Sequence, residues 1–185
     1  MSGRAKLTAV VLRSVDYGES DRILTLLTEA RGKISAFARS ARASKRRFGG
    51  ALEVFTIVDA ELKERTGSDL WTLESVAVRR AFGAIRQDLT RIACAGYACE
   101  LARELVREGE AQPELFAVLV TYLERLEAKP AEPTGLRAFE LRALQAAGVL
   151  PRLDACVRCG GALTAARLRF DPGEGGVLCG DCGPA

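Results

Sequence analysis

Hydrophobic residues in the first eighty positions recur with the period of β-strands. Two apolar runs, 7–15 and 22–28, flank the sequence DYGES, in which Gly18 can adopt a positive φ and form a turn. From Ala51 onward every second residue is apolar or small, and the expected buried face comprises Leu52, Val54, Thr56, Val58, Ala60 and Leu62. The loop ERTGSD then leads to a last apolar run, LWTLESVAV. We predict a strand in each of these four segments.

A further strand is predicted at the start of the segment 31–50, RGKISAFARSARASKRRFGG. One face of this strand carries Arg31, Lys33, Ser35, Phe37 and Arg39, and the other carries Gly32, Ile34, Ala36, Ala38 and Ser40. The second face is small and apolar, which suits the interior of a tight barrel, although the pattern alone does not fix which face points inward. Residues 1–80 are therefore predicted to form an antiparallel β-barrel of the oligonucleotide-binding (OB) type.

From residue 81 to residue 150 the hydrophobic period changes to that of helices. In the first expected helix, which Gly109 ends, the apolar stripe comprises Ile85, Leu89, Ile92, Gly96, Leu101 and Leu105, and we expect Cys94 and Cys99 to be small core residues. A second helix begins at Pro113, with Leu115, Leu119, Tyr122, Leu123 and Leu126 facing inward. After the breaker PAEP, a third helix spans 136–147 and is closed by Gly148, with Phe139, Leu141 and Leu144 as its apolar residues. These helices are predicted to form a small scaffold domain.

Charge is distributed unevenly along the 185 residues. Residues 1–80 contain 15 Lys plus Arg and 10 Asp plus Glu, a net charge of +5, whereas residues 81–185 contain 12 and 14, a net charge of −2. Seven of the cations lie within 31–50, and that segment contains no acid. A concentration of one sign of charge favours a polyanionic partner.

We interpret the segment 31–50 as a nucleic-acid-binding surface. One face of its strand mixes cations with the ring of Phe37, so phosphates can bind there and a base can stack. The residues after the strand are expected to form a mobile loop that orders on a phosphate backbone; its cations are Arg42, Lys45, Arg46 and Arg47. Two alternatives remain open: the loop is only a solvated charged surface, and Phe37 belongs to the core.

Four of the six cysteines form two C-x-x-C pairs, Cys156 with Cys159 and Cys179 with Cys182, each next to glycines. A tight turn in each pair directs two thiolates at one ion, and the intervening sequence reads as a hairpin that brings the pairs together. Four thiolates fill a tetrahedral site, so we predict one structural Zn²⁺ in a zinc-ribbon-like module, residues 151–185. A redox dithiol is the alternative, and the matched pairs with their glycines argue against it.

The sequence contains no histidine. This excludes Ser-His-Asp and Cys-His nucleophile systems and a histidine general base, and the filled cysteine site disfavours a metalloenzyme, so we do not expect an enzyme. The run 7–12 is too short for a signal-peptide core, and the run from Leu115 is too short for a membrane span. We expect a cytoplasmic protein with no membrane partner.

Four stretches taken together resemble the bacterial RecO family of recombination mediators. They are DYGESDRILTLLTEARGKISAFARSAR followed by FGGALEVF, then ELRALQAAGVLPRLDACVRCGGAL, and the terminal VLCGDC. The resemblance implies an α+β protein, with an OB-type barrel, a helical domain that carries the four-cysteine zinc module, and no catalytic turnover. It assigns DNA contacts to Lys33, Arg39, Arg42, Lys45, Arg46 and Arg47, and zinc to the cysteine quartet.

The resemblance also implies partners. Proteins of this family bind single- and double-stranded DNA, anneal complementary strands, associate with RecR, and contact the C-terminal tail of single-stranded DNA-binding protein to help load RecA on gaps. Family members usually continue for several tens of residues beyond the second C-x-x-C, so we expect the helical domain here to lack its C-terminal helices. The alternative function is a protein–protein adaptor in which the basic loop only steers assembly.

Overall fold

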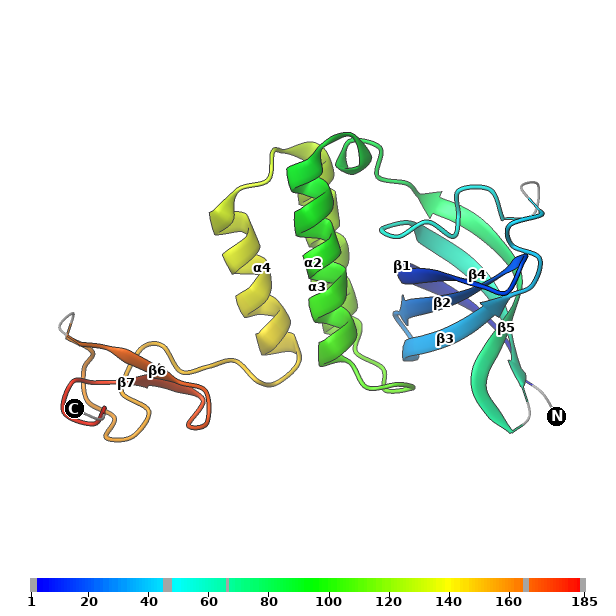
Figure 1. Cartoon of the computed structure of the whole chain (residues 1–185). Helices are drawn as coiled ribbons and strands as arrows, with labels where there is room; N and C mark the ends of the chain where they lie inside the picture. The colour runs from blue at the N-terminus through cyan, green and yellow to red at the C-terminus, as the bar shows by residue number, and fades with distance from the viewer. Residues whose placement is uncertain (1–2, 45–47, 66, 165–166, 184–185) are drawn as a thin grey trace. The chain divides into compact units, whose positions relative to one another are not determined.

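The computed structural model describes residues 3–44, 48–65, 67–164 and 167–183 (Figure 1). The chain divides into two compact units, residues 1–143 and residues 144–185. The first contains a β-barrel and most of the helical residues, and the second contains a short hairpin with the cysteine quartet. Each unit is described by itself. The predicted boundaries at residues 80 and 150 stay a prediction.

Five strands form a closed barrel at the start of the first unit (Figure 1). They are β1 (Arg4–Tyr17), β2 (Asp21–Thr28), β3 (Gly32–Ala38), β4 (Ile57–Arg65) and β5 (Ser68–Arg80). The order around the barrel is β1-β2-β3-β5-β4, and β4 pairs with β1 to close it. All pairs are antiparallel except the short contact between β3 and β5, which is parallel. The predicted OB-type barrel is confirmed.

The structure settles which face of β3 points inward. Gly32, Ile34, Ala36 and Ala38 are buried, and the residues between them are partly exposed. Small side chains on this strand leave room for the larger leucines of β2 and β4 in the interior. The face that carries Lys33 and Phe37 is therefore the outer face, as the composition of the two faces suggested.

The strand that the alternation predicts from Ala51 begins only at Ile57. Phe55 has a φ of 69°, which interrupts an extended backbone, and its N–H donates to the Val11 carbonyl at 3.0 Å. Leu52 is buried together with Phe48 in the barrel core, from a turn and not from a strand. The inward positions Val58, Ala60 and Leu62 are confirmed; the earlier half of the predicted strand is wrong.

Helix α2 (Leu89–Leu105) follows a short 3-10 helix, η1 (Ile85–Gln87). Its N-terminus is capped by Asp88, whose side chain accepts from the Arg91 N–H at 2.9 Å. The predicted apolar stripe is wrong over α2: Leu89 is 84% exposed, and the buried face of the helix consists of Ala95, Ala98, Cys99 and Ala102. Ile85, the first residue of the predicted stripe, is buried as expected but lies in η1. Small side chains on this face let the neighbouring elements approach α2 closely, so alanine and not leucine is buried. Cys99 is a core residue as predicted, whereas Cys94 is only half-buried.

Helices α3 (Pro113–Ala128) and α4 (Pro133–Ala146) complete the helical part. The five residues predicted to face inward from the second helix are all buried. The ring of Tyr122 on α3 stacks on that of Phe139 on α4, with centroids 4.6 Å apart. Gly148, with a φ of 73°, ends α4 as predicted, and the next N–H, that of Val149, donates to the Leu144 carbonyl at 2.9 Å. No helix among the described residues is long and apolar enough to cross a membrane.

Backbone contacts join the barrel to the helices within the first unit. The Gly109 N–H donates to the Lys33 carbonyl at 2.9 Å, so the segment after α2 pairs with the start of β3. At Gly32 a Cβ would lie 1.8 Å from the carbonyl oxygen of Glu110, and φ there is +62°. Glycine is therefore required where the two parts approach most closely.

The second unit contains a two-stranded hairpin, β6 (Arg169–Asp171) and β7 (Gly176–Leu178). The turn between the strands forms because the Asp171 side chain accepts from the N–H groups of Gly173 and Glu174. The predicted hairpin is confirmed, with strands of three residues each.

Candidate metal centre and nucleic-acid interface

The two C-x-x-C pairs meet in one cluster. The sulfur atoms of Cys156, Cys159, Cys179 and Cys182 all lie within 4.8 Å of one another, and that of Cys159 is 3.8 Å from that of Cys179. A tetrahedral zinc site with Zn–S bonds of about 2.3 Å places its sulfurs roughly 3.8 Å apart. The cluster therefore has the size that a tetrahedral ion bound by four thiolates requires.

The local sequence explains how each pair forms. The Gly160 N–H donates to the Cys156 carbonyl at 2.9 Å, and the Gly183 N–H donates to the Cys179 carbonyl at 3.0 Å, so both pairs lie in tight turns. Gly161 directs its N–H at the Cys159 sulfur, at 3.4 Å. The glycine next to the first pair thus brings a backbone amide close to one of the sulfurs.

The thiols in the cluster differ in acidity. Hydrogen bonds with the backbone of Cys159 and then of Cys179 lower the pKa of the Cys156 thiol to about 6. Hydrogen bonds with the thiols of Cys179 and Cys159 raise the pKa of Cys182 to about 12. Four crowded sulfurs cannot all ionise without a compensating cation, which a bound metal ion supplies. The four cysteines can thus bind a metal, and four protein ligands leave no open position for a substrate.

Arg158 fastens the hairpin to the second cysteine pair. Its guanidinium forms an ion pair with Glu174 in the hairpin turn, with Nε 3.1 Å from Oε1, and donates to the Cys182 carbonyl at 2.6 Å. In the sequence Arg158 stands between the two cysteines of the first pair, so one residue links both pairs to the hairpin. The sequence pattern gave no indication of this role.

The eight residues predicted to bind DNA fall into two groups. Lys45, Arg46 and Arg47 lie outside the described residues. The structure describes the other five, Arg31, Lys33, Phe37, Arg39 and Arg42, on or close to β3.

Arg31 and Lys33 already have partners on the barrel or the helices. Arg31 forms an ion pair with Glu64 at 3.2 Å, and its guanidinium lies 5.3 Å from the centre of the Trp71 ring. The Lys33 ammonium donates to the carbonyl of Arg103 at 2.7 Å, at the end of α2. Lys33 thus contributes to the contact between barrel and helices.

Arg39 and Arg42 lie where the chain leaves β3. The Arg42 N–H donates to the Ser20 carbonyl at 2.9 Å, and its guanidinium lies 3.7 Å from the Asp16 carboxylate. These contacts fasten the start of the basic loop to the turn between β1 and β2. Arg39 is exposed, and within the part of the chain that the structure describes its side chain has no hydrogen bond or ion pair.

The structure adds Tyr17 to this surface. Phe37 is partly exposed on the outer face of β3, and its ring meets that of Tyr17 edge to face, with centroids 5.9 Å apart. The alternative that Phe37 belongs to the barrel core does not fit this position. Strand β1 extends two residues beyond its predicted end at residue 15. Continuing the period-two pattern of the strand to residue 17 would have placed Tyr17 on the same face as Val15.

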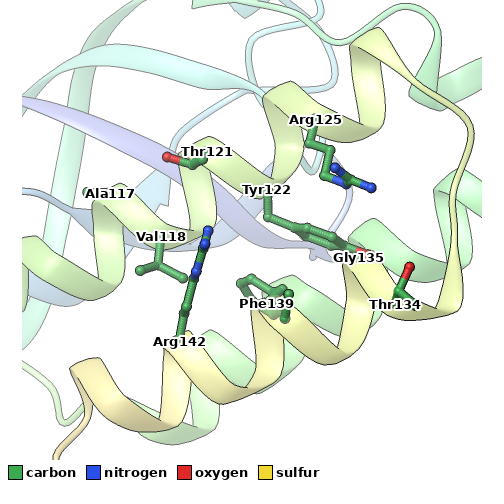
Figure 2. Close-up of a pocket in the computed structure, with 10 residues that line it drawn as sticks. Ala117, Val118, Thr121, Tyr122, Arg125, Thr134, Gly135, Phe139 and Arg142 are labelled. Atoms are coloured by element: carbon green, nitrogen blue, oxygen red, sulfur yellow. The ribbon is translucent and has the colours of Figure 1, made fainter.

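A separate pocket of about 370 Å³ lies between α3 and α4. Figure 2 shows the rings of Tyr122 and Phe139 in its middle, with Arg125 and Arg142 on opposite sides of them. Arg125 forms an ion pair with Glu132 at 2.8 Å. The sequence does not predict this pocket, because the residues that line it come from two helices and the hydrophobic pattern does not specify that these helices pack together.

Comparison with known proteins identifies the family of the whole chain. Residues 1–82 match the model of the recombination protein O N terminal, and residues 86–185 match that of the recombination protein O C terminal. DNA repair protein RecO of Anaeromyxobacter dehalogenans strain 2CP-1 is 66% identical over 181 residues, which cover 98% of this chain and 71% of the relative. The RecO proteins of Myxococcus xanthus and Geobacter sulfurreducens are 55% and 46% identical, each over 95% of this chain and 71% of the relative. The chain therefore belongs to the RecO family of DNA repair proteins, which are recombination mediators and not enzymes.

Proposed function

We propose that this protein binds single- and double-stranded DNA through the outer face of its barrel and anneals complementary strands. The observation that carries the proposal is the segment 31–50, which holds seven cations and no acid. Its strand, β3, presents the ring of Phe37 on the outer face of the barrel, in contact with the ring of Tyr17. Membership of a DNA repair family supports DNA as the polyanion. The protein would act in the cytoplasm, at the nucleoid.

The cations predicted to contact DNA differ in which existing interactions they must give up to bind a phosphate. Arg39 is free to meet a phosphate, and we assign the same role to Lys45, Arg46 and Arg47. Arg31 and Arg42 must exchange an exposed carboxylate for a phosphate, which costs little because exposed ion pairs contribute about 0 to 1 kcal/mol. Lys33 would have to leave the Arg103 carbonyl, so we expect its contribution to be the smallest.

The partner proteins of this function follow from the family resemblance. We propose that the protein associates with RecR and assists RecA loading at gaps covered by single-stranded DNA-binding protein. In the alternative function, a protein–protein adaptor, the same partners bind but the basic segment does not contact DNA.

The pocket between α3 and α4 supports a contact with the C-terminal tail of single-stranded DNA-binding protein. A chain terminus carries an α-carboxylate, which an arginine can bind with two hydrogen bonds. An apolar terminal side chain would pack against the stacked pair Tyr122 and Phe139, and Arg142, which has no ion pair among the described residues, would bind the carboxylate.

Replacing Arg142 with alanine is therefore expected to weaken binding of a peptide with the tail sequence by roughly 10-fold or more, because a charge-assisted hydrogen bond is lost. Amidating the peptide's terminus should weaken binding to the same extent. Arg137→Ala, on the same helix but outside the pocket, is the control, and binding is measured by fluorescence anisotropy of the labelled peptide. Equal affinities of wild type and Arg142→Ala would remove the pocket as the site.

We further propose that the metal held by the cysteine quartet is zinc and that its role is structural. Zn²⁺ takes four thiolates in tetrahedral geometry, which matches both the donor set and the distances between the sulfurs. The ion would hold the hairpin and the two turns together, and it would supply no chemistry for a substrate.

Titration of a labelled oligonucleotide tests DNA binding against the adaptor function. If about 4 to 7 phosphates are neutralised, log affinity for single strands should fall against log salt with a slope of roughly −3 to −5. An adaptor would show no measurable binding even at about 50 mM salt, where electrostatic contacts are strong. Absence of binding at that salt concentration would refute the proposed function.

A further inference from the structure

The outer face of β1, β2 and β3 carries a row of apolar side chains. Val15 lies opposite Ile23, and Ile23 lies opposite Phe37, so the three side chains form one line across the strands. Tyr17 lies one position further along this face of β1, and its ring contacts that of Phe37. We call Val15, Tyr17, Ile23 and Phe37 the outer patch.

The outer patch is not explained by the stability of the barrel. The barrel core lies on the other face of these strands, and Tyr17 is 56% exposed while Val15 is 41% exposed. Within the described part of the chain the Tyr17 hydroxyl has no hydrogen-bond partner. Single exposed apolar residues are common on protein surfaces, but four that adjoin one another with an edge-to-face aromatic pair indicate a binding surface.

Unpaired cations lie at both ends of the outer patch. Arg13 precedes Val15 by two residues on the same face of β1, and Arg39 follows Phe37 by two residues. Both side chains are exposed, and neither forms an ion pair with any residue that the structure describes. The two aromatic rings are thus flanked by free positive charge along the strand direction.

The outer patch adjoins the basic loop. The Ser40 N–H donates to the Asp21 carboxylate at 2.7 Å, and the Arg42 N–H donates to the Ser20 carbonyl. These bonds hold the start of the loop against the β1–β2 turn, next to the end of the strand that carries Tyr17. The described start of the loop therefore lies beside the end of the outer patch that carries Tyr17.

We propose that the outer patch is a stacking platform for unpaired bases, and that it makes the protein discriminate single-stranded from double-stranded DNA. This inference rests on the proposed function. Bases of a single strand can turn outward and stack on Tyr17 and Phe37, while Arg13 and Arg39 bind the flanking phosphates. Bases in a duplex are stacked on one another and cannot reach the rings, so a duplex gains only the phosphate contacts of the basic segment.

The rings of the platform and the cations of the loop contribute differently to DNA affinity. Rings contribute an affinity that does not depend on salt, because no counterion is released when a base stacks. Loop cations contribute an affinity that depends on salt and is shared by single strands and duplexes. A protein that anneals strands needs to hold bases exposed for pairing, and it needs to release the duplex that forms. A platform that binds unpaired bases and cannot bind a duplex meets both requirements.

The test replaces Tyr17 with leucine, which keeps an apolar side chain and removes the ring. Affinities are measured for a thymidine oligonucleotide of about 16 nucleotides, the upper range for one OB fold, and for a duplex of the same length. Tyr17→Leu is expected to lower single-strand affinity by between about 5-fold and 100-fold, the range for loss of one stacked base, and to change duplex affinity by less than about 2-fold. The salt slope should stay unchanged, and Tyr17→Trp should restore single-strand affinity.

Two controls separate this inference from the proposed function. Tyr97→Leu removes another exposed tyrosine, on α2, and should leave both affinities unchanged. Arg46→Ala with Arg47→Ala should weaken both forms of DNA and flatten the slope. If Tyr17→Leu and Phe37→Leu each bind single strands as wild type does, or lose single strands and duplexes equally, the platform is refuted while DNA binding stands. If wild type binds neither form, both proposals fail.

Discussion

Replacing Cys156 with serine is expected to abolish metal binding and to unfold the second unit while the barrel stays folded. Within residues 144–164 and 167–183 the only buried apolar residues are Cys156 itself and Leu178. Such a core is far too small to offset the conformational entropy of ordering the segment. Structural zinc contributes apparent binding free energies of roughly 10 to 16 kcal/mol in zinc-finger peptides, so the metal is expected to supply most of the stability.

The measurements are the metal content of the full chain and the hydrogen exchange of its amides. Wild type should carry about one zinc per chain, and Cys156→Ser well below that, with loss of protection confined to the second unit. Cys94→Ala, which removes a thiol outside the quartet, is the control and should keep the metal. Elemental analysis that finds no zinc in gently purified wild type would contradict the site.

Replacing Gly32 with alanine is expected to destabilise the first unit by about 3 kcal/mol or more. Two costs add: a left-handed backbone costs an L-residue about 1 to 2 kcal/mol, and overpacking typically costs about 1 to 3 kcal/mol. The second cost is unavoidable here because the new Cβ would lie 1.8 Å from a carbonyl oxygen of the backbone, at Glu110. The clash can be removed only if β3 moves away from the segment that follows α2.

Gly18→Ala is the matched control for this prediction. Gly18 has a φ of +60°, nearly that of Gly32, but among the described residues no atom beyond its two chain neighbours lies within 4 Å of its expected Cβ. Urea denaturation of both variants should show a loss of about 1 to 2 kcal/mol for Gly18→Ala and a clearly larger loss for Gly32→Ala. Equal losses would mean that the contact between β3 and the helical part does not constrain the fold.

Features that depend on local sequence alone were predictable. The alternation in 32–38 identifies both faces of β3, because side chains of a strand must point alternately to its two sides. The spacing of the cysteines predicts a four-sulfur cluster, because a C-x-x-C turn can direct both sulfurs at one ion. The alternation lies within seven residues, and each C-x-x-C turn within four.

Features that depend on contacts between distant segments were not predictable. The turn at Phe55 depends on a bond to Val11 in β1, and a period-two pattern continues across it. The buried face of α2 is determined by what packs on it, so the helix buries alanines although leucines were available. Likewise, the partners of Lys33 and the pocket between α3 and α4 require knowledge of which elements become neighbours.

The most direct test of the central claim, that the basic segment on the barrel binds DNA electrostatically, is the salt dependence of single-strand affinity. Wild type is compared with the variant that carries both Arg46→Ala and Arg47→Ala. Lys129→Ala with Arg137→Ala removes the same charge from exposed positions in the helical part and serves as the control. The double loop variant is predicted to bind more weakly at about 50 mM salt, with a slope of log affinity against log salt flattened by roughly one unit or more, while the control keeps the wild-type slope. A loop variant with the affinity and slope of wild type would contradict the account.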